Sequence, residues 1–148
     1  MKKLLMSLSV VALLAGMSGC SKDDPAPSKV CSARIDGDLF EASLIEGSYD
    51  ADNNVTVEGY EGASQGFTFT FNLDEVEEGE TYDIENFEFG AGFLSDDGEF
   101  FLAVSGEVHV TKVNNTRFEA TFEFTGEGFG GGDIEVTDGV IKTDLVEE

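Results

Sequence analysis

The chain has 148 residues, of which 31 are acidic and 8 are basic, so its formal net charge at pH 7 is −23. A charge of this size repels nucleic acid and anionic membrane surfaces, and neither is expected as a partner. Thirteen Phe residues and many Val and Ile residues alternate with the acids. This alternation is typical of a folded β-rich domain and excludes a disordered chain.

Residues 1–19 are predicted to be a cleaved signal peptide. Lys2 and Lys3 give it a positively charged start, and an uncharged apolar run covers residues 4–15. A bilayer core is roughly 30 Å thick, and this run is too short to span it as a permanent helix. It has the length of the hydrophobic region of a signal peptide.

The end of this segment resembles the lipobox of bacterial lipoproteins. Small residues, Ser18 and Gly19, precede Cys20, and Met17 stands where the family usually has leucine. The resemblance implies that Cys20 becomes the acylated first residue of the mature chain. The alternative is an ordinary secretory signal followed by an incidental cysteine.

Residues 20–29 are predicted to be a lipidated tether. Four polar residues in it resemble the short acidic export signal of surface lipoproteins of Bacteroidetes: Ser21, Lys22, Asp23 and Asp24. The alternative is a solvated acidic linker. A Pro-containing stretch at 25–29 then favours a semi-rigid spacer. The expected location is the outer membrane, lipid-anchored, with the domain facing the cell exterior.

Cleavage would leave about 129 residues, enough for one domain, at residues 30–148. Its hydrophobicity alternates with period two and shows no helical window. The clearest strand is 67–73, where every second residue is large and apolar, and 117–125 repeats the pattern. One face of each strand must be covered by another layer.

Turn residues divide the domain into about eight to ten short antiparallel strands. The expected segments are 30–35, 39–45, 55–60, 67–73, 81–84 with 87–89, 99–104, 107–113, 117–125, 134–137 and 140–145. Asp36-Gly37 and Asp138-Gly139 are expected as tight turns. The segment 99–104, apolar on both faces, is expected in the middle of a sheet. The predicted fold is all-β, an antiparallel β-sandwich or an open β-barrel, and periodicity does not choose between them.

Three segments of the domain resemble small uncharacterised lipoproteins of Bacteroidetes. These segments are the opening 33–42, the strand 118–125 and the closing stretch 134–140. Ala120 and Ile141 depart from the family pattern, which has a glycine and an aromatic residue there. The family has no assigned function, so the resemblance implies a fold and a location but no activity.

A calcium site is one interpretation of the acidic stretch after residue 49. Asp50, Asp52, Asn54 and Glu61 fall on ligand positions of a calcium-binding loop, which gathers hard oxygen ligands. Val55 stands where the sharp turn of such a loop needs glycine. The alternative is a polar hairpin loop, since Asp and Asn are common turn residues.

Other reactive residues are expected to be structural. Cys31 is predicted to be a small core residue, and His109 a surface histidine without a catalytic partner. The acidic segments 74–78 and 96–97 are expected to be solvated faces. The glycine-rich segment 126–132 is expected to be a loop.

The function predicted is that of a non-catalytic cell-envelope lipoprotein, a surface-exposed binding or structural module without a cofactor. Its partners would be the lipid bilayer, through acylated Cys20, and an unknown protein or glycan. The alternative is a calcium- or glycan-binding accessory component of a surface uptake system. That alternative requires the calcium residues to converge, or Tyr49, Tyr60 and Tyr82 to line one exposed face.

Overall fold

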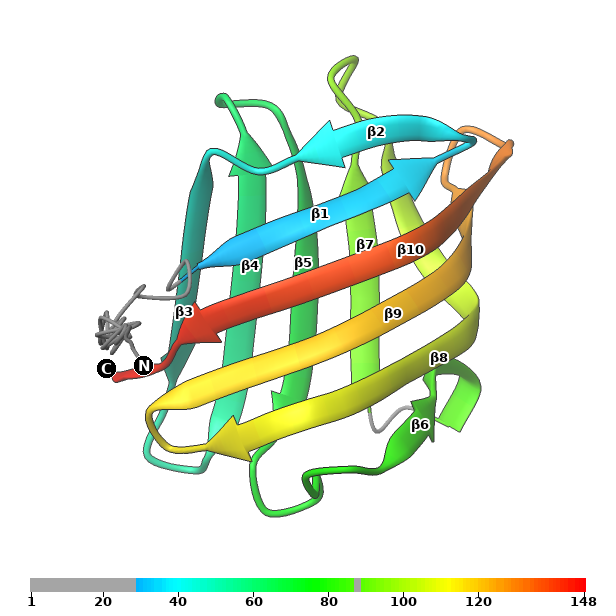
Figure 1. The fold of residues 1–148 in the computed structure, drawn as a ribbon. Coiled ribbons are helices and arrows are strands. Elements are labelled where there is room, and N and C mark those ends of the chain that lie inside the picture. Colours follow the sequence, from blue (N-terminus) through cyan, green and yellow to red (C-terminus); the bar gives the residue numbers. More distant parts are fainter. Residues whose placement is uncertain (1–28, 87–88) are drawn as a thin grey trace, which may run out of the picture.

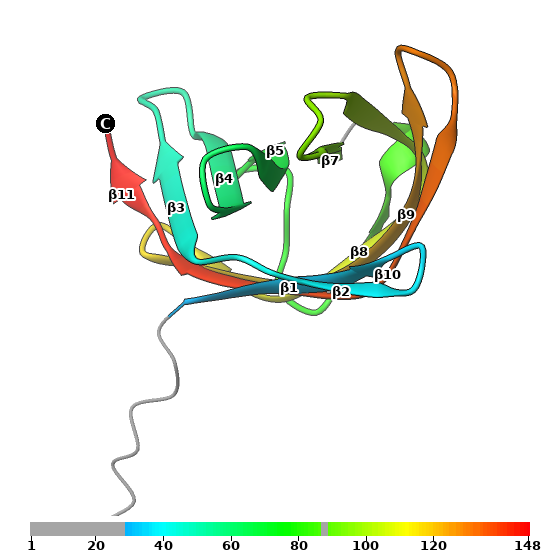
Figure 2. The same ribbon diagram turned by 90° about the horizontal axis from the view of Figure 1, so that it is seen from above.

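The structure, a computed structural model, describes residues 29–86 and 89–148. The predicted signal peptide, the lipidation site Cys20 and the export signal at residues 21–24 lie outside these ranges. The described chain is almost entirely β-structure, which confirms the predicted fold class. A single sheet of eleven strands curls on itself into an open half-barrel (Figures 1 and 2).

The strands follow the chain in an almost continuous meander. Their bounds are β1 Val30–Ile35, β2 Asp38–Glu41, β3 Leu44–Tyr49, β4 Asn54–Glu61, β5 Gln65–Asn72, β6 Thr81–Asp83, β7 Phe89–Leu94, β8 Phe100–Asn114, β9 Arg117–Gly128, β10 Asp133–Asp144 and β11 Val146–Glu147. One 3-10 turn, η1, covers Ile84–Asn86. The order in the sheet is β11-β3-β4-β5-β7-β8-β9-β10-β1-β2, and β6 pairs with β8.

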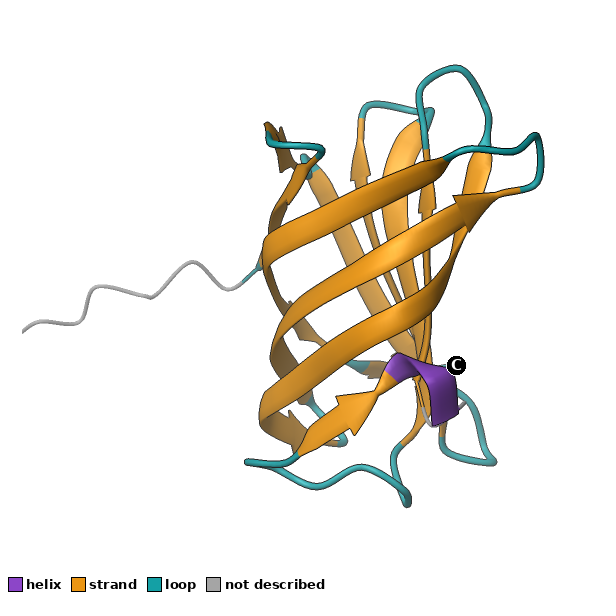
Figure 3. Ribbon diagram, turned by 90° about the vertical axis from the view of Figure 1, so that its right-hand side faces the viewer, coloured by secondary structure: helices purple, strands orange, loops and turns teal. Residues whose placement is uncertain are grey.

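The curl brings two halves of the sheet face to face. Strands β3, β4, β5 and β7 form one half, and the long strands β8, β9 and β10 cross them with β1 and β2 (Figures 1 and 3). At Leu145 the chain leaves β10, and β11 then pairs in parallel with β3. The C-terminal residues therefore join the two halves along one side.

Aromatic side chains fill the space between the halves. Phe67, Phe69 and Phe71 of β5 point inward, as their alternation predicted, and pack on rings of β9. The ring centroids of Phe69 and Phe122 lie 4.7 Å apart, and those of Phe71 and Phe118 lie 4.6 Å apart. These contacts across the interior supply the covering layer that the sequence required.

Several predicted segments were wrong in detail. The expected segments 81–84 and 87–89 do not form one strand, because β6 ends at Asp83 and the 3-10 turn η1 covers Ile84–Asn86. The expected strand 39–45 is divided between β2 and β3, with a break at residues 42–43. The expected turn Asp138-Gly139 is a bulge within the continuous strand β10, and Asp138 has a φ of 52° there. The segment 99–104 lies in the middle of the sheet, between β7 and β9, as expected, but it is not buried on both faces, because Leu102 and Val104 are exposed on the outside of β8.

None of the helical structure in the described ranges is long and apolar enough to cross a membrane.

Candidate functional site

The end of the half-barrel where the turns β1–β2, β4–β5 and β7–β8 meet contains a hollow of about 320 Å³. We call it the mouth hollow. The rings of Phe40, Phe93 and Phe101 lie at its base. Leu39 is also part of its lining, with 62% of its surface exposed. Openings of β-barrels are common places for ligand sites.

The rim of the mouth hollow is acidic. Six carboxylates line it: Asp36, Asp38, Glu61, Asp96, Asp97 and Glu99. They come from β1–β2, from the end of β4 and from the turn between β7 and β8. The lining contains no Lys, Arg or His side chain. The field at this opening therefore favours cations.

Three of these carboxylates also shape the rim, and one of them, Glu99, accepts a 3.2 Å hydrogen bond from the Gly130 backbone N–H. Asp36, which has a φ of 50°, accepts a 2.8 Å hydrogen bond from the Glu135 backbone N–H. Asp97 accepts a hydrogen bond from the Ser95 hydroxyl, and this contact, with the Glu99 backbone N–H, lowers the pKa of Asp97. These bonds hold the two turns in fixed conformations.

The other three carboxylates have no side-chain or backbone partner within the described ranges. The residues Asp38, Glu61 and Asp96 are exposed, and no hydrogen bond or ion pair involves their carboxylate oxygens there. The nearest basic residue along the chain, Arg34, pairs with Asp138 at 3.6 Å. The unpaired oxygens therefore remain available to a ligand.

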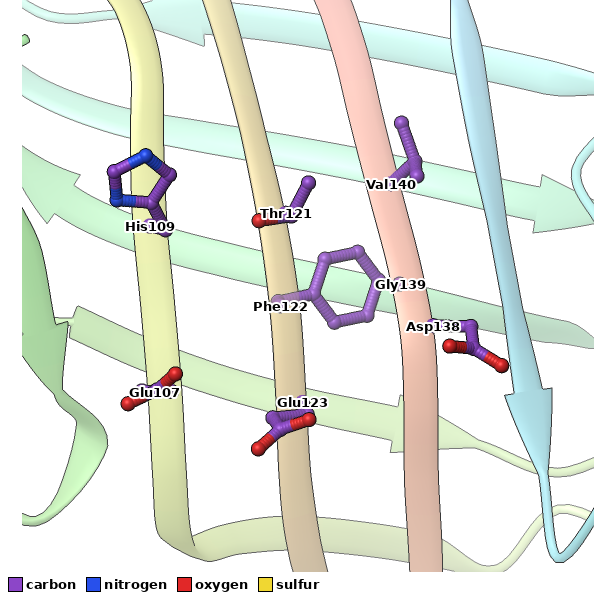
Figure 4. Close-up of a pocket in the computed structure, with 8 residues that line it drawn as sticks. All are labelled: Glu107, His109, Thr121, Phe122, Glu123, Asp138, Gly139 and Val140. Carbon is purple, nitrogen blue, oxygen red and sulfur yellow. The ribbon is translucent and has the colours of Figure 1, made fainter. Parts of the chain in front are cut away.

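A second hollow, of about 390 Å³, lies on the outer face of β8, β9 and β10. Figure 4 shows the carboxylates of Glu107, Glu123 and Asp138 across these three strands. His109 lies beside them, and its Nδ1 is 3.0 Å from the Thr81 hydroxyl. No carboxylate hydrogen-bonds to this imidazole within the described ranges, and His109 is half-buried.

The base of this outer hollow is closed by an aromatic ring. In Figure 4 Phe122 lies beside Gly139, and a Cβ at Gly139 would come within 2.4 Å of the ring atom Cδ2. The same ring is 4.7 Å from Phe69 in the core, measured between centroids. The Phe122 ring therefore separates the outer hollow from the core.

The predicted calcium residues are only partly brought together. Asp50, Asp52 and Asn54 share the β3–β4 turn, while Glu61 lies at the opposite end of β4 and lines the mouth hollow. One oxygen of Asp50 accepts 2.9 Å hydrogen bonds from the backbone N–H groups of Asp52 and Asn54. The Asn54 side chain and backbone lower the pKa of Asp50.

These contacts are those of a self-contained polar turn. No group of three or more His, Cys, Asp or Glu residues in the described ranges is placed to hold a metal ion. Calcium binding stays a prediction, and it would rest on the β3–β4 turn without Glu61.

The tyrosines do not form one platform. Tyr60 lies outward over Gly66, where a Cβ would be 2.3 Å from its ring, and its hydroxyl donates to Glu58 at 3.0 Å. Tyr49 and Tyr82 instead pack against the hydrophobic core.

Cys31 is a buried core residue, as predicted. Its side chain lies close to Gly59, where a Cβ would be 2.6 Å from Sγ. Burial raises the pKa of the Cys31 thiol to about 12, which makes it a poor nucleophile.

The sequence did not single out Asp38, Leu39 or Glu99, and it assigned Asp96-Asp97 to a solvated face. A signal for their grouping was present. In an antiparallel meander every second turn falls at the same end, and this rule brings the turns after β4 and β7 together. The β1–β2 turn joins them because β1 pairs antiparallel with β10, a pairing distant in sequence. The hollow itself depends on the curl of the sheet, which period-two alternation does not encode.

Fold and site together define a class: a curled, open all-β half-barrel with an aromatic base and an acidic mouth. A family described as a domain of unknown function (DUF6252) matches residues 28–143. The chain belongs to this family. No curated protein and no solved structure matched the chain.

Proposed function

We propose that the protein is a non-catalytic lipoprotein of the cell envelope, of the Bacteroidetes surface type, that binds a ligand at its mouth. The observation that carries this proposal is the position of the mouth hollow relative to the start of the domain. β1 begins at Val30, directly after the predicted tether, and ends at Ile35 and Asp36, which line the mouth hollow.

The mouth and the attachment point therefore lie at opposite ends of the same strand (Figure 1). Cys20 precedes Lys29 by nine residues, which reach at most about 30 Å when extended. A chain held in a membrane at Cys20 would keep the start of β1 near the surface and leave the opening accessible. Acyl chains provide stable anchoring because each buried CH₂ adds about 0.8 kcal/mol.

The chemistry of the described residues supports a binding role over a catalytic one. Cys31 is buried with a raised pKa, and His109, although it contacts the Thr81 hydroxyl, has no carboxylate hydrogen-bonded to its imidazole within the described ranges. General acid–base or nucleophilic catalysis requires such groups to meet in one accessible place. The mouth hollow instead offers carboxylates and apolar surface.

The anchor is tested by metabolic labelling with a palmitate analogue in cells that express the full chain. Wild type and Cys31→Ala should incorporate the label and fractionate with membranes, whereas Cys20→Ala should do neither. Label on the Cys20→Ala protein, or membrane retention without label, would refute lipid anchoring at this residue.

The outward orientation is tested on the same cells with an external protease. Wild type should be digested in intact cells, and Asp23→Asn with Asp24→Asn should remain lipidated but become protected. Protection of the wild type would place the domain inside the envelope and remove the surface part of the proposal.

A further inference from the structure

We propose that the mouth hollow binds a small organic cation, an ammonium group carried on an apolar body. This inference rests on the proposed binding role of the mouth and names the chemical class of its ligand. It depends on three features that occur together at this end of the barrel: a concave shape, an apolar base and unpaired carboxylates.

The shape limits the size of the ligand. A volume of about 320 Å³ is near the lower end of ligand pockets, which span roughly 300–1,000 Å³. The hollow therefore has the size of a site for a small molecule.

The apolar part of the ligand has a defined place. Phe40, Phe93 and Phe101 form the base, and the exposed side chain of Leu39 forms part of the wall. An apolar group that enters the hollow would cover Leu39 and remove its surface from water. Aromatic rings near a cation add an attraction through their electron-rich faces.

The charge of the ligand follows from the rim. Asp38, Glu61 and Asp96 approach the hollow from three separate segments and are not neutralised by any side chain that lines it. An anion would meet six carboxylates, and a neutral molecule would leave their charges unbalanced. A single ammonium group has three donors and can contact more than one of these carboxylates at once.

Acidity alone does not define this site. The loop 74–80 between β5 and β6, at the opposite end of the barrel, also carries exposed acids, among them Glu75, Glu78 and Glu80. The aromatic base found at the mouth is missing from this loop, whose one large apolar residue after Asp74, Val76, is buried in the core. This loop provides a matched control, since it can lose the same number of charges without changing the mouth.

The experiment uses the mature lipidated protein, purified in a neutral detergent at low ionic strength, and isothermal titration calorimetry. The probes are 2-phenylethylammonium, the uncharged 2-phenylethanol and the anionic 3-phenylpropionate. We expect the cation to bind at least about tenfold more tightly than the alcohol, the anion to give no heat of binding, and affinity for the cation to fall as salt is added.

Two triple variants locate the site. Asp38→Asn with Glu61→Gln and Asp96→Asn should weaken cation binding at least about tenfold, while Glu75→Gln with Glu78→Gln and Glu80→Gln should stay within about twofold of wild type. Equal losses in both variants would show a general charge effect and overturn the site.

Equal affinity for the alcohol and the cation, or no binding of the cation, would overturn the ligand class. Palmitate labelling of Cys20 and surface accessibility are measured separately. A lipidated, exposed protein that ignores the ammonium probe would refute this inference and leave the proposed envelope role standing.

Discussion

Replacing Phe67 with alanine should destabilise the domain more than any exposed substitution of the same kind. Phe67 is fully buried, and its ring centroid lies 4.9–6.2 Å from those of five other phenylalanines: Phe40, Phe69, Phe93, Phe122 and Phe124. Loss of a buried Phe side chain typically costs about 3–5 kcal/mol. Because these rings belong to both halves of the sheet, we expect the upper part of that range.

Phe129 provides the matched control, because its ring is 82% exposed and stacks only on Phe100 with centroids 6.2 Å apart. Phe129→Ala should change the free energy of unfolding by about 0.5 kcal/mol or less. Urea unfolding followed by far-UV circular dichroism suits a chain that has no Trp. If both variants lose the same stability, the rings between the sheet halves do not form the core and the curled architecture is wrong.

Three further predictions concern single side chains. Because burial raises the pKa of Cys31 to about 12, iodoacetamide at about pH 8 should leave this thiol unmodified in the native protein. In urea the same reagent should alkylate it, as measured by mass spectrometry. Modification of Cys31 in the native protein would contradict its burial. The hydrogen bond from Arg117 holds the pKa of Glu119 below its ordinary 4.5, so this carboxylate stabilises the fold above that pH and loses its effect as the pH falls. Glu119→Gln should therefore cost about 1 kcal/mol at neutral pH, and the difference from wild type should vanish in acid; a pH-independent difference would refute the ion-pair origin. With Glu61 remote from Asp50, about 1 mM Ca²⁺ should leave the melting temperature unchanged, and a rise that Asp50→Asn abolishes would instead establish a site in the β3–β4 turn.

Alternation of side chains made much of the fold predictable. Strand β1 has the bounds expected from the sequence, and Phe118, Ala120, Phe122 and Phe124 of β9 all point into the core as their spacing indicated. The reason is that successive side chains of a strand point to opposite faces, so burial on one face is written directly into the sequence.

The errors occurred where the backbone departs from regular pleating. Asp138-Gly139 has turn chemistry, but β9 and β1 flank β10 on both sides, and their pairing carries the strand through as a bulge. Likewise Gly106, with a φ of 135°, follows a shift of register in β8, so two predicted segments form one strand of 15 residues. Local residue preferences cannot reveal such neighbours, because pairing partners distant in sequence decide whether a glycine ends a strand or bends it.

Carboxylates have different surroundings on the outer wall of the half-barrel and at its mouth. On the outer face of β9, Glu119 contacts both Arg117 at 2.9 Å and Lys142 at 3.7 Å, so its charge is balanced by neighbours. At the mouth, Asp38 and Asp96 face an opening that no Lys, Arg or His side chain lines. Like charges held together in this way reduce the stability of the fold. Departures from local stabilising rules tend to occur at functional sites. The exposed Leu39 lies beside these acids, so one ligand with an apolar body and a positive charge would contact both.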